Sequence, residues 1–285
     1  MPLTTTGVIA AAAAGPGRAA AAFNVISLEH AEGLVAGAER AGCAVILQIS
    51  ENCVRYHGDL LPLASACLAT ARAASVPVAV HLDHAESVDL VDAAIAAGLG
   101  SVMYDASRLD YAANVAATRE VTATAHVAGV WVEAELGEVG GKDGAHAPGA
   151  RTDPDEARAF VAATGVDALA VAVGSSHAMA TRDAVLDLDL VARLRDAVDV
   201  PLVLHGSSGV PDDVLRAAVA AGIVKVNIGT QLNRVFTGGV RAALAARPDV
   251  VDPRRYLDAG RAALADETAR LLEVIGAVPA AALPA

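Results

Sequence analysis

Short apolar runs alternate along this chain with longer segments of helical periodicity, and this alternation constrains the fold more than any other feature. Strands are expected over residues 21–26, 43–49, 76–82, 101–104, 131–136, 168–173, 201–204 and 223–228. Helices are expected near 28–41, 60–73, 87–97, 110–128, 154–164, 190–198 and 211–221, with two more over 231–246 and 254–275. Repeated β/α units predict the α/β class, as a single (β/α)8 TIM barrel with extra C-terminal helices over residues 1–285.

Polar side chains follow the expected strands at their carboxyl ends. The apolar run at 78–82 leads directly to Asp83 and His84. An unpaired buried polar group costs roughly 1–3 kcal/mol, so such a strand end should meet solvent, a metal or a substrate. The other strands lead to a similar set: Asp105, Glu133, Glu135, His177, His205 and Asn227. Because TIM-barrel chemistry lies at the carboxyl ends of the strands, we expect the site there.

Three histidines at three different strand ends, His84, His177 and His205, have the number and placement of a metal site with open positions for substrate. Imidazole ligands favour zinc and its first-row neighbours. Taken singly, each histidine could equally be a hydrogen-bonded loop residue, but their shared placement favours a metal. His81 also lies at a strand end and can equally orient the site.

Carboxylates and small residues complete the expected site. Asp83 could move a proton on a metal-bound substrate, or support an imidazole. Asp105 and Glu135 could form a second cation position, or a solvated pair. The turns 206–209 and 227–230 supply N–H groups and hydroxyls after the last two strands, where barrels hold phosphate.

Composition narrows the class of protein. A net charge of −12 argues against nucleic acid or an anionic membrane as a partner. The three cysteines are an odd number without CxxC spacing, which disfavours a disulfide framework or a thiolate zinc site and predicts reduced packing residues. The alanine-rich opening 8–14 lacks a preceding basic region and is a poor signal peptide. We therefore expect a cytoplasmic protein.

An ordered set of motifs resembles the class II, metal-dependent ketose-bisphosphate aldolases, the family of fructose- and tagatose-bisphosphate aldolases. The set covers nearly the whole barrel and comprises Ala22-Phe23-Asn24-Val25, Gln48-Ile49-Ser50, His81-Leu82-Asp83-His84, Val132 to Gly137, Val173 to His177, His205 to Gly209 and Asn227 to Thr230. One such motif would be weak evidence, whereas all of them in this order are strong evidence.

The resemblance implies zinc-dependent, reversible cleavage of a ketose 1,6-bisphosphate to dihydroxyacetone phosphate and an aldehyde such as glyceraldehyde 3-phosphate, as in glycolysis. It implies that His84, His177 and His205 bind zinc and that Asp83 is the acid/base at the C4 hydroxyl. Asp105 and Glu135 would serve a second divalent position, and a monovalent cation could also bind. The substrate would contact Asn24, Ser50, Ala178, Gly206, Ser207, Ser208, Asn227, Gly229 and Thr230. The resemblance also implies a homodimer or homotetramer.

Because the chain departs from the family pattern at several positions, the resemblance does not identify the sugar that is cleaved. Ala178 stands where the family usually has glycine, and Gly229 stands where fructose-type members have aspartate. The loop after the fifth strand often carries a glutamate that moves the enediolate proton, and here it offers Asp143 or Glu138.

Several alternatives stay open at this point. The substrate could be another phosphorylated ketose or a keto-acid. Other classes are a Schiff-base lyase using Lys142 or Lys225, a metal-dependent hydrolase, or a non-catalytic barrel that binds sugar phosphate.

Overall fold

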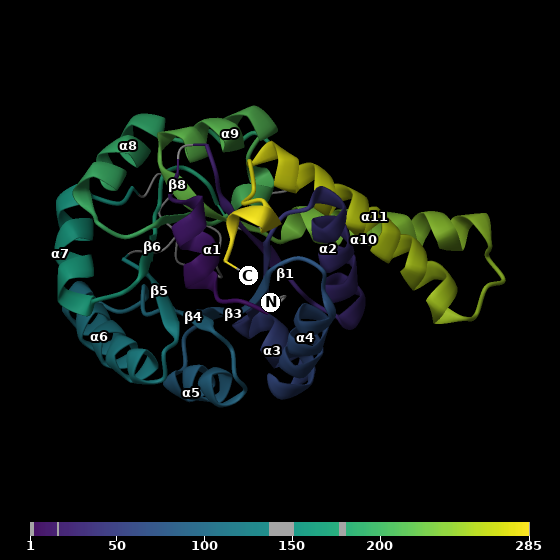
Figure 1. Ribbon diagram of the computed structural model, residues 1–285, viewed down its shortest axis with the longest axis horizontal. Helices are drawn as coiled ribbons and strands as arrows, with labels where there is room; N and C mark the ends of the chain where they lie inside the picture. Colours follow the sequence, from purple (N-terminus) through teal and green to yellow (C-terminus); the bar gives the residue numbers. More distant parts are fainter. Residues whose placement is uncertain (1–2, 16, 137–150, 177–180, 285) are drawn as a thin grey trace.

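Eight parallel strands close into a barrel in chain order, which confirms the predicted (β/α)8 TIM barrel (Figure 1). The computed structural model describes residues 3–15, 17–136, 151–176 and 181–284. The strands are β1 (Ala20–Asn24), β2 (Val45–Ser50), β3 (Val78–Ala85), β4 (Ser101–Tyr104), β5 (Trp131–Glu135), β6 (Ala168–Ala170), β7 (Leu202–Leu204) and β8 (Ile223–Ile228). The barrel closes through pairing of β1 with β8.

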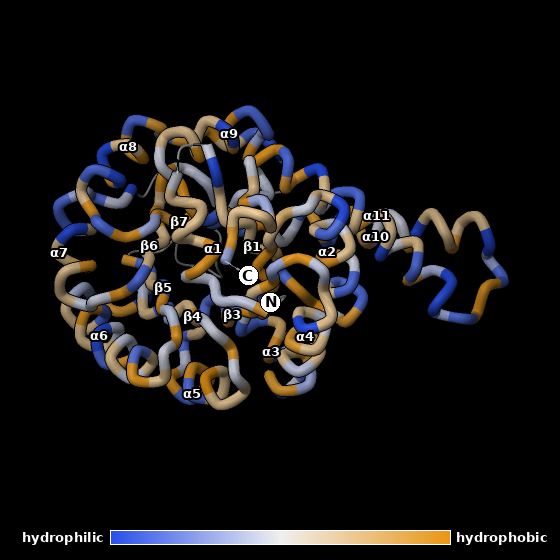
Figure 2. Tube along the Cα trace, in the orientation of Figure 1, coloured by the Kyte–Doolittle hydropathy of each residue, from blue (hydrophilic) through white to orange (hydrophobic). Residues whose placement is uncertain are grey.

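Helices surround the strands, and hydrophilic residues are spread around the outer edge of this ring (Figure 2). The helices are α1 (Thr6–Ala13), α2 (Leu28–Ala41), α3 (Glu51–His57), α4 (Leu61–Ala73), α5 (Val88–Ala96), α6 (Tyr111–Val127), α7 (Pro154–Thr164), α8 (Leu188–Ala197), α9 (Asp212–Ala221), α10 (Thr230–Ala246) and α11 (Pro253–Val274). Capping side chains define several starts. Asp153 accepts hydrogen bonds from two backbone N–H groups at the start of α7, with proline in its first turn.

Helix α1 is the main element that the sequence analysis did not predict. It packs against β1, β3 and β8 at the amino ends of the strands, opposite the expected site. Ile9 and Ala13 of α1 are buried with Ala20, Ala22 and Ile46 of the first two strands. Because alanine side chains are small, this helix can lie close across the end of the barrel and close its apolar interior to water.

Three boundaries differ from the expected ones in ways that affect the site. Strand β3 continues to Ala85, so Asp83 and His84 lie within it and not beyond it. Strand β6 ends at Ala170 and not at Val173. A short helix, α3, follows β2 directly, with the Ser50 hydroxyl accepting a hydrogen bond from Cys53 N–H at 3.2 Å. Apolar runs therefore locate the strands, but they do not show where strand pairing stops.

Helices α10 and α11 form a hairpin that extends beyond the barrel (Figure 1). Helix α11 also packs closely on α2, where a Cβ added at Gly37 would lie 2.5 Å from the carbonyl oxygen of Ala265. The three cysteines are free thiols, as expected, and Cys53 and Cys67 are buried. No helix among the described residues is both long enough and apolar enough to cross a membrane.

Candidate active site

The carboxyl ends of the strands surround a cavity of about 430 Å³. Most of the expected site residues line it: Asn24, Ser50, Asp83, His84, His205, Gly206, Ser207, Ser208, Asn227, Gly229 and Thr230. Asp105 and Glu135 lie beside His84, next to this cavity. Three other expected residues, Asp143, His177 and Ala178, lie outside the described residues. The structure thus brings together side chains from β1, β2, β3, β7 and β8 that are far apart in the sequence.

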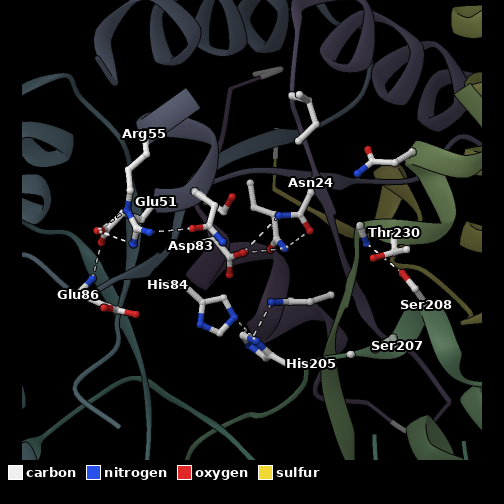
Figure 3. A pocket seen from close by; sticks show the side chains of 18 of the residues that line it. Asn24, Glu51, Arg55, Asp83, His84, Glu86, His205, Ser207, Ser208 and Thr230 are labelled. Carbon is white, nitrogen blue, oxygen red and sulfur yellow. Dashed lines mark hydrogen bonds and ion pairs between the residues drawn. The ribbon is translucent and has the colours of Figure 1, made fainter. Parts of the chain in front are cut away.

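Two imidazoles face each other at the bottom of the cavity (Figure 3). His84 Nε2 lies 2.8 Å from His205 Nδ1. The opposite nitrogens meet carboxylates, since His84 Nδ1 lies 2.8 Å from Asp105 Oδ2 and His205 Nε2 lies 2.8 Å from Glu133 Oε1. Each carboxylate accepts a hydrogen bond from the N–H of its imidazole, so the two nitrogens that face each other both carry lone pairs. Two lone pairs at this distance repel each other and form a donor set suited to a cation.

Burial keeps the His205 imidazole neutral, as a metal ligand must be. Its side chain is fully buried. Burial is the main cause that lowers the pKa of His205 to about 4, and the hydrogen bond to Glu133 acts in the opposite direction. Because the lowering by burial prevails, His205 offers a lone pair at neutral pH.

His84 has an unusual backbone conformation. Its φ is 51°, and it is the one non-glycine residue with positive φ in the described part of the chain. The β3–β4 pairing shifts register between Leu82 and Ala85, on either side of His84. A bulge of this kind re-aims a side chain, and a non-glycine residue in this region costs about 1–3 kcal/mol. The bulge aims the His84 ring toward His205.

The Asp83 carboxylate lies beside the imidazole pair, with a donor atom within 4.8 Å of a ring nitrogen of each histidine. One oxygen, Oδ2, accepts hydrogen bonds from Asn24 Nδ2 at 3.3 Å and Gln48 Nε2 at 3.4 Å. The other, Oδ1, has no hydrogen-bond partner among the described residues. Burial by itself would raise the pKa of Asp83, but the neighbouring His84 and His205, with further basic groups, lower it to about 2. Asp83 is therefore an ionised carboxylate with one oxygen available to accept a proton.

Two groups of side chains have donor atoms close enough to hold a metal ion. Asp83, His84 and His205 form the first, and His84, Asp105 and Glu135 form the second. Within each group the donor atoms lie within 4.8 Å of one another. His84 belongs to both groups, so two adjacent cation positions would share this ligand.

A fully buried ion pair lies beneath the imidazoles, and the sequence analysis assigned it no role. Lys225 Nζ lies 2.8 Å from Glu133 Oε2, and neither side chain is exposed. His81 is also fully buried, with Nδ1 2.9 Å from Ser101 Oγ. The two-residue spacing of Glu133 and Glu135 could have predicted that Glu133 points to the same side of β5 as the expected site residue Glu135, because residues i and i+2 share one face of a strand. Lys225 and Asn227 have the same spacing on β8, so the same signal was available for the direction of Lys225 but not for its partner.

Two turns on one side of the cavity present small residues to it (Figure 3). Gly206 has a φ of 67°, and a Cβ there would lie 2.5 Å from the carbonyl oxygen of Ser176. The Ser208 hydroxyl accepts hydrogen bonds from Gly229 N–H at 3.3 Å and Gln231 N–H at 3.1 Å, which ties the two turns together. Helix α10 begins at Thr230, so its N-terminus faces the cavity. Backbone N–H groups and a helix N-terminus together favour an anion such as phosphate.

The opposite wall carries four charged residues and one amide that were not expected from the sequence: Glu51, Arg55, Glu86, Arg108 and Asn52. Arg55 donates hydrogen bonds to Glu51 at 3.0 Å and to Asn52 at 3.0 Å, and Arg108 lies 3.6 Å from Glu86. These residues are on loops and on α3, outside the strand ends on which the sequence analysis concentrated.

The position of Lys225 tests one of the alternative functions, a Schiff-base lyase. Its amine is fully buried, is paired with Glu133 and does not line the cavity. A Schiff base requires a lysine that can reach the substrate carbonyl. Lys225 is therefore not placed to form a Schiff base with a substrate in this cavity. Lys142 lies outside the described residues.

Comparisons with known proteins agree with the fold and give a family. The profile of the family described as "Fructose-bisphosphate aldolase class-II" matches residues 4–279. The crystal structure of the YdjI aldolase from Escherichia coli K12 is 32% identical, with a TM-score of 0.85 over 96% of this chain and 97% of that one. The fructose-bisphosphate aldolase from Campylobacter jejuni is 21% identical and has the same fold, with a TM-score of 0.82 over 98% of this chain and 96% of that one.

Proposed function

Because the chain belongs to the class II fructose-bisphosphate aldolases, a family of aldehyde-lyases, we propose that it cleaves a phosphorylated ketose reversibly with the help of zinc. The proposed products are dihydroxyacetone phosphate and an aldehyde. The observation that carries the proposal is the pair of facing imidazole nitrogens, 2.8 Å apart, with the ionised Asp83 beside them.

The donor set fits a divalent ion. His84 and His205 would hold it together with His177, and Asp105 and Glu135 would offer a second cation position next to His84. Neutral imidazoles suit zinc. When bound, the ion supplies Lewis-acid polarisation of the ketose carbonyl and stabilises the negative charge that develops there.

Side chains of the protein carry out the proton transfers and orient the groups involved. Asp83 takes the proton of the C4 hydroxyl on its available oxygen as the C3–C4 bond breaks, and the electron pair of that bond moves toward the carbonyl. Asn24 and Gln48 hold the other oxygen and so orient the carboxylate. Asp143 is the proposed group that returns a proton to the three-carbon product.

The proposed phosphate site is on the side of the cavity formed by the turns 206–209 and 227–230. The backbone of Gly206, Ser207 and Ser208 and the segment 227–230 would hold the phosphate of the dihydroxyacetone part. Ser50 and Ala178 complete the proposed substrate contacts. The close approach of Asn24 to Gly229, where a Cβ would lie 2.7 Å from Asn24 Oδ1, leaves little room for a larger residue at position 229.

The substrate we propose is a ketose 1,6-bisphosphate of the fructose or tagatose type, with glyceraldehyde 3-phosphate as the aldehyde. A different phosphorylated ketose is the alternative, and one observation favours it. Arg55 and Arg108 on the wall opposite the glycine-serine turns are both paired with glutamates, so they add little net positive charge for a second phosphate. A substrate with an uncharged distal end fits such a wall.

Assembly and location are part of the same proposal. The hairpin of α10 and α11 extends beyond the barrel and exposes Leu244 and Val251, which supports a homodimer or homotetramer. The free cysteines support the cytoplasm as its compartment.

A panel of ketose bisphosphates and monophosphates, assayed after chelation and metal add-back, tests the proposal. Cleavage should need a divalent ion. His84→Ala should lose both bound metal and cleavage, whereas Asp83→Ala should keep the metal and lose about 10²–10⁴-fold in rate. Full activity in either variant, or cleavage in excess chelator, would refute the assigned roles.

A further inference from the structure

The Glu133–Lys225 pair is the clearest feature near the site that the proposed mechanism does not use. Both side chains are fully buried beneath the imidazoles. Removing two charges from water is costly, and a hydrophobic pair of similar volume often stabilises a protein as well or better. Stability is therefore a weak reason for an ion pair here, and its contacts point to another role.

The two oxygens of Glu133 have different partners. Oε1 lies 2.8 Å from His205 Nε2, and Oε2 lies 2.8 Å from Lys225 Nζ. Lys225 Nζ also donates to Asn227 Oδ1 at 2.9 Å. Since each oxygen and the amine have a fixed partner, the carboxylate has one orientation relative to the His205 ring.

This orientation determines which nitrogen of His205 carries the proton. Asn227 Nδ2 also lies near His205 Nε2, at 3.1 Å, and would favour a lone pair there. The Glu133 contact is shorter and involves an anion, so it is the stronger of the two and requires Nε2–H. With the proton on Nε2, the lone pair is on Nδ1, which faces His84 Nε2.

We propose that Glu133 and Lys225 are positioning residues that hold His205 in the Nε2–H form, so that Nδ1 is presented to the divalent ion. Glu133 does this directly, and Lys225 acts through Glu133 by fixing its second oxygen and balancing its charge. The inference rests on the proposed function only in taking His205 as a metal ligand.

Replacing the carboxylate by an amide tests the inference. In Glu133→Gln the side chain can present either its oxygen or its NH₂ group to Nε2, so the proton is no longer fixed. We expect zinc affinity, measured by competition with a chelating dye, to fall about 10–100-fold. Nitrogen-15 NMR of labelled histidine should show Nε2–H at His205 in the metal-free wild type and a mixture of tautomers in the variant. Lys225→Met should shift both measurements in the same direction by a smaller amount.

Ser101→Ala is the matched control. It removes buried hydrogen bonds to His81 and Thr6 in the same barrel interior, but it leaves the partners of His205 in place. Its zinc affinity and His205 tautomer should therefore match the wild type even where its thermal stability falls.

Two results would overturn the inference. One is wild-type zinc affinity in a folded Glu133→Gln protein. The other is Nδ1–H at His205 in the metal-free wild type, a measurement that needs no variant to fold. If affinity falls as expected while the wild type cleaves none of the ketose phosphates, the positioning role is supported and only the proposed reaction fails.

Discussion

His81 should make the stability of the protein fall steeply as the pH drops from 7 to 5. Burial is the main cause that lowers the pKa of His81 to about 3, with a further contribution from Lys225. In the unfolded chain the same imidazole has the ordinary histidine pKa of 6.5. Between these values the unfolded state binds a proton that the folded state does not, so acid favours unfolding. The contribution is fully present above pH 6.5 and is lost as the pH falls toward 3.

The size of the effect follows from the two pKa values. At pH 5 the solution is 1.5 units below the pKa of 6.5 in the unfolded chain. Protonation of this imidazole then stabilises the unfolded state by about 2 kcal/mol, at about 1.4 kcal/mol per unit. His81→Asn removes this titration, and its amide can keep a hydrogen bond to Ser101. We expect the variant to be less stable than the wild type at pH 7, but to lose about 2 kcal/mol less between pH 7 and pH 5.

Urea unfolding at the two pH values, in the presence of a chelator, measures this difference. Trp131 is the single tryptophan and its ring centroid lies 6.4 Å from that of His81, so its fluorescence reports on this part of the barrel. Val91→Ala is the control, because it truncates a buried side chain without removing a titratable group. An equal loss of stability in His81→Asn and wild type would refute the reasoning.

Three further predictions concern packing, the phosphate turn and the metal. Gly37→Ala should destabilise the protein by about 2 kcal/mol in urea unfolding, because its Cβ would lie 2.5 Å from both the Ala265 carbonyl oxygen and Thr268 Cβ. Gly238→Ala is the control and should stabilise by about 0.5–1 kcal/mol, because its Cβ would meet nothing within 4 Å. An equal effect of the two substitutions would contradict the close α2–α11 packing. Gly206→Ala should raise the KM for the phosphorylated ketose about tenfold, since its φ is 67° and its Cβ would meet a backbone oxygen; an unchanged KM would argue against phosphate at this turn. Chelation should lower the Tm by about 5 °C relative to protein with zinc at 100 times its Kd, and an unchanged Tm would count against a bound metal.

The barrel and most of the residues around its cavity were predictable because their signals are local. Strand-length apolar runs and helical periodicity are read within a short window, and polar residues at strand ends meet at one face of a barrel whatever the details of packing. For this reason Asp83, His84 and His205 could be grouped before any contact between them was known. The roles assigned to them, and to Asp143, His177 and Ala178 outside the described residues, stay predictions.

Other features had no local signal. Helix α1 is built of small residues whose burial depends on the barrel end that it closes. Helix α3 was not predicted either, nor was the presence of Arg55 and Arg108 in the cavity wall. Their positions follow from how loops cross the top of the barrel, which a single sequence does not show.

The sequence by itself determined the eightfold β/α pattern and the face of the barrel at which polar side chains gather, because both depend on neighbours a few residues apart. Only the tertiary structure decided the pairing of Lys225 with Glu133, the division of the Glu133 oxygens between two partners and the positive φ of His84. Glu133 and Lys225 are 92 residues apart, and His84 and His205 are 121 apart. Such contacts exist only after the barrel has closed, since closure brings these strands around one interior.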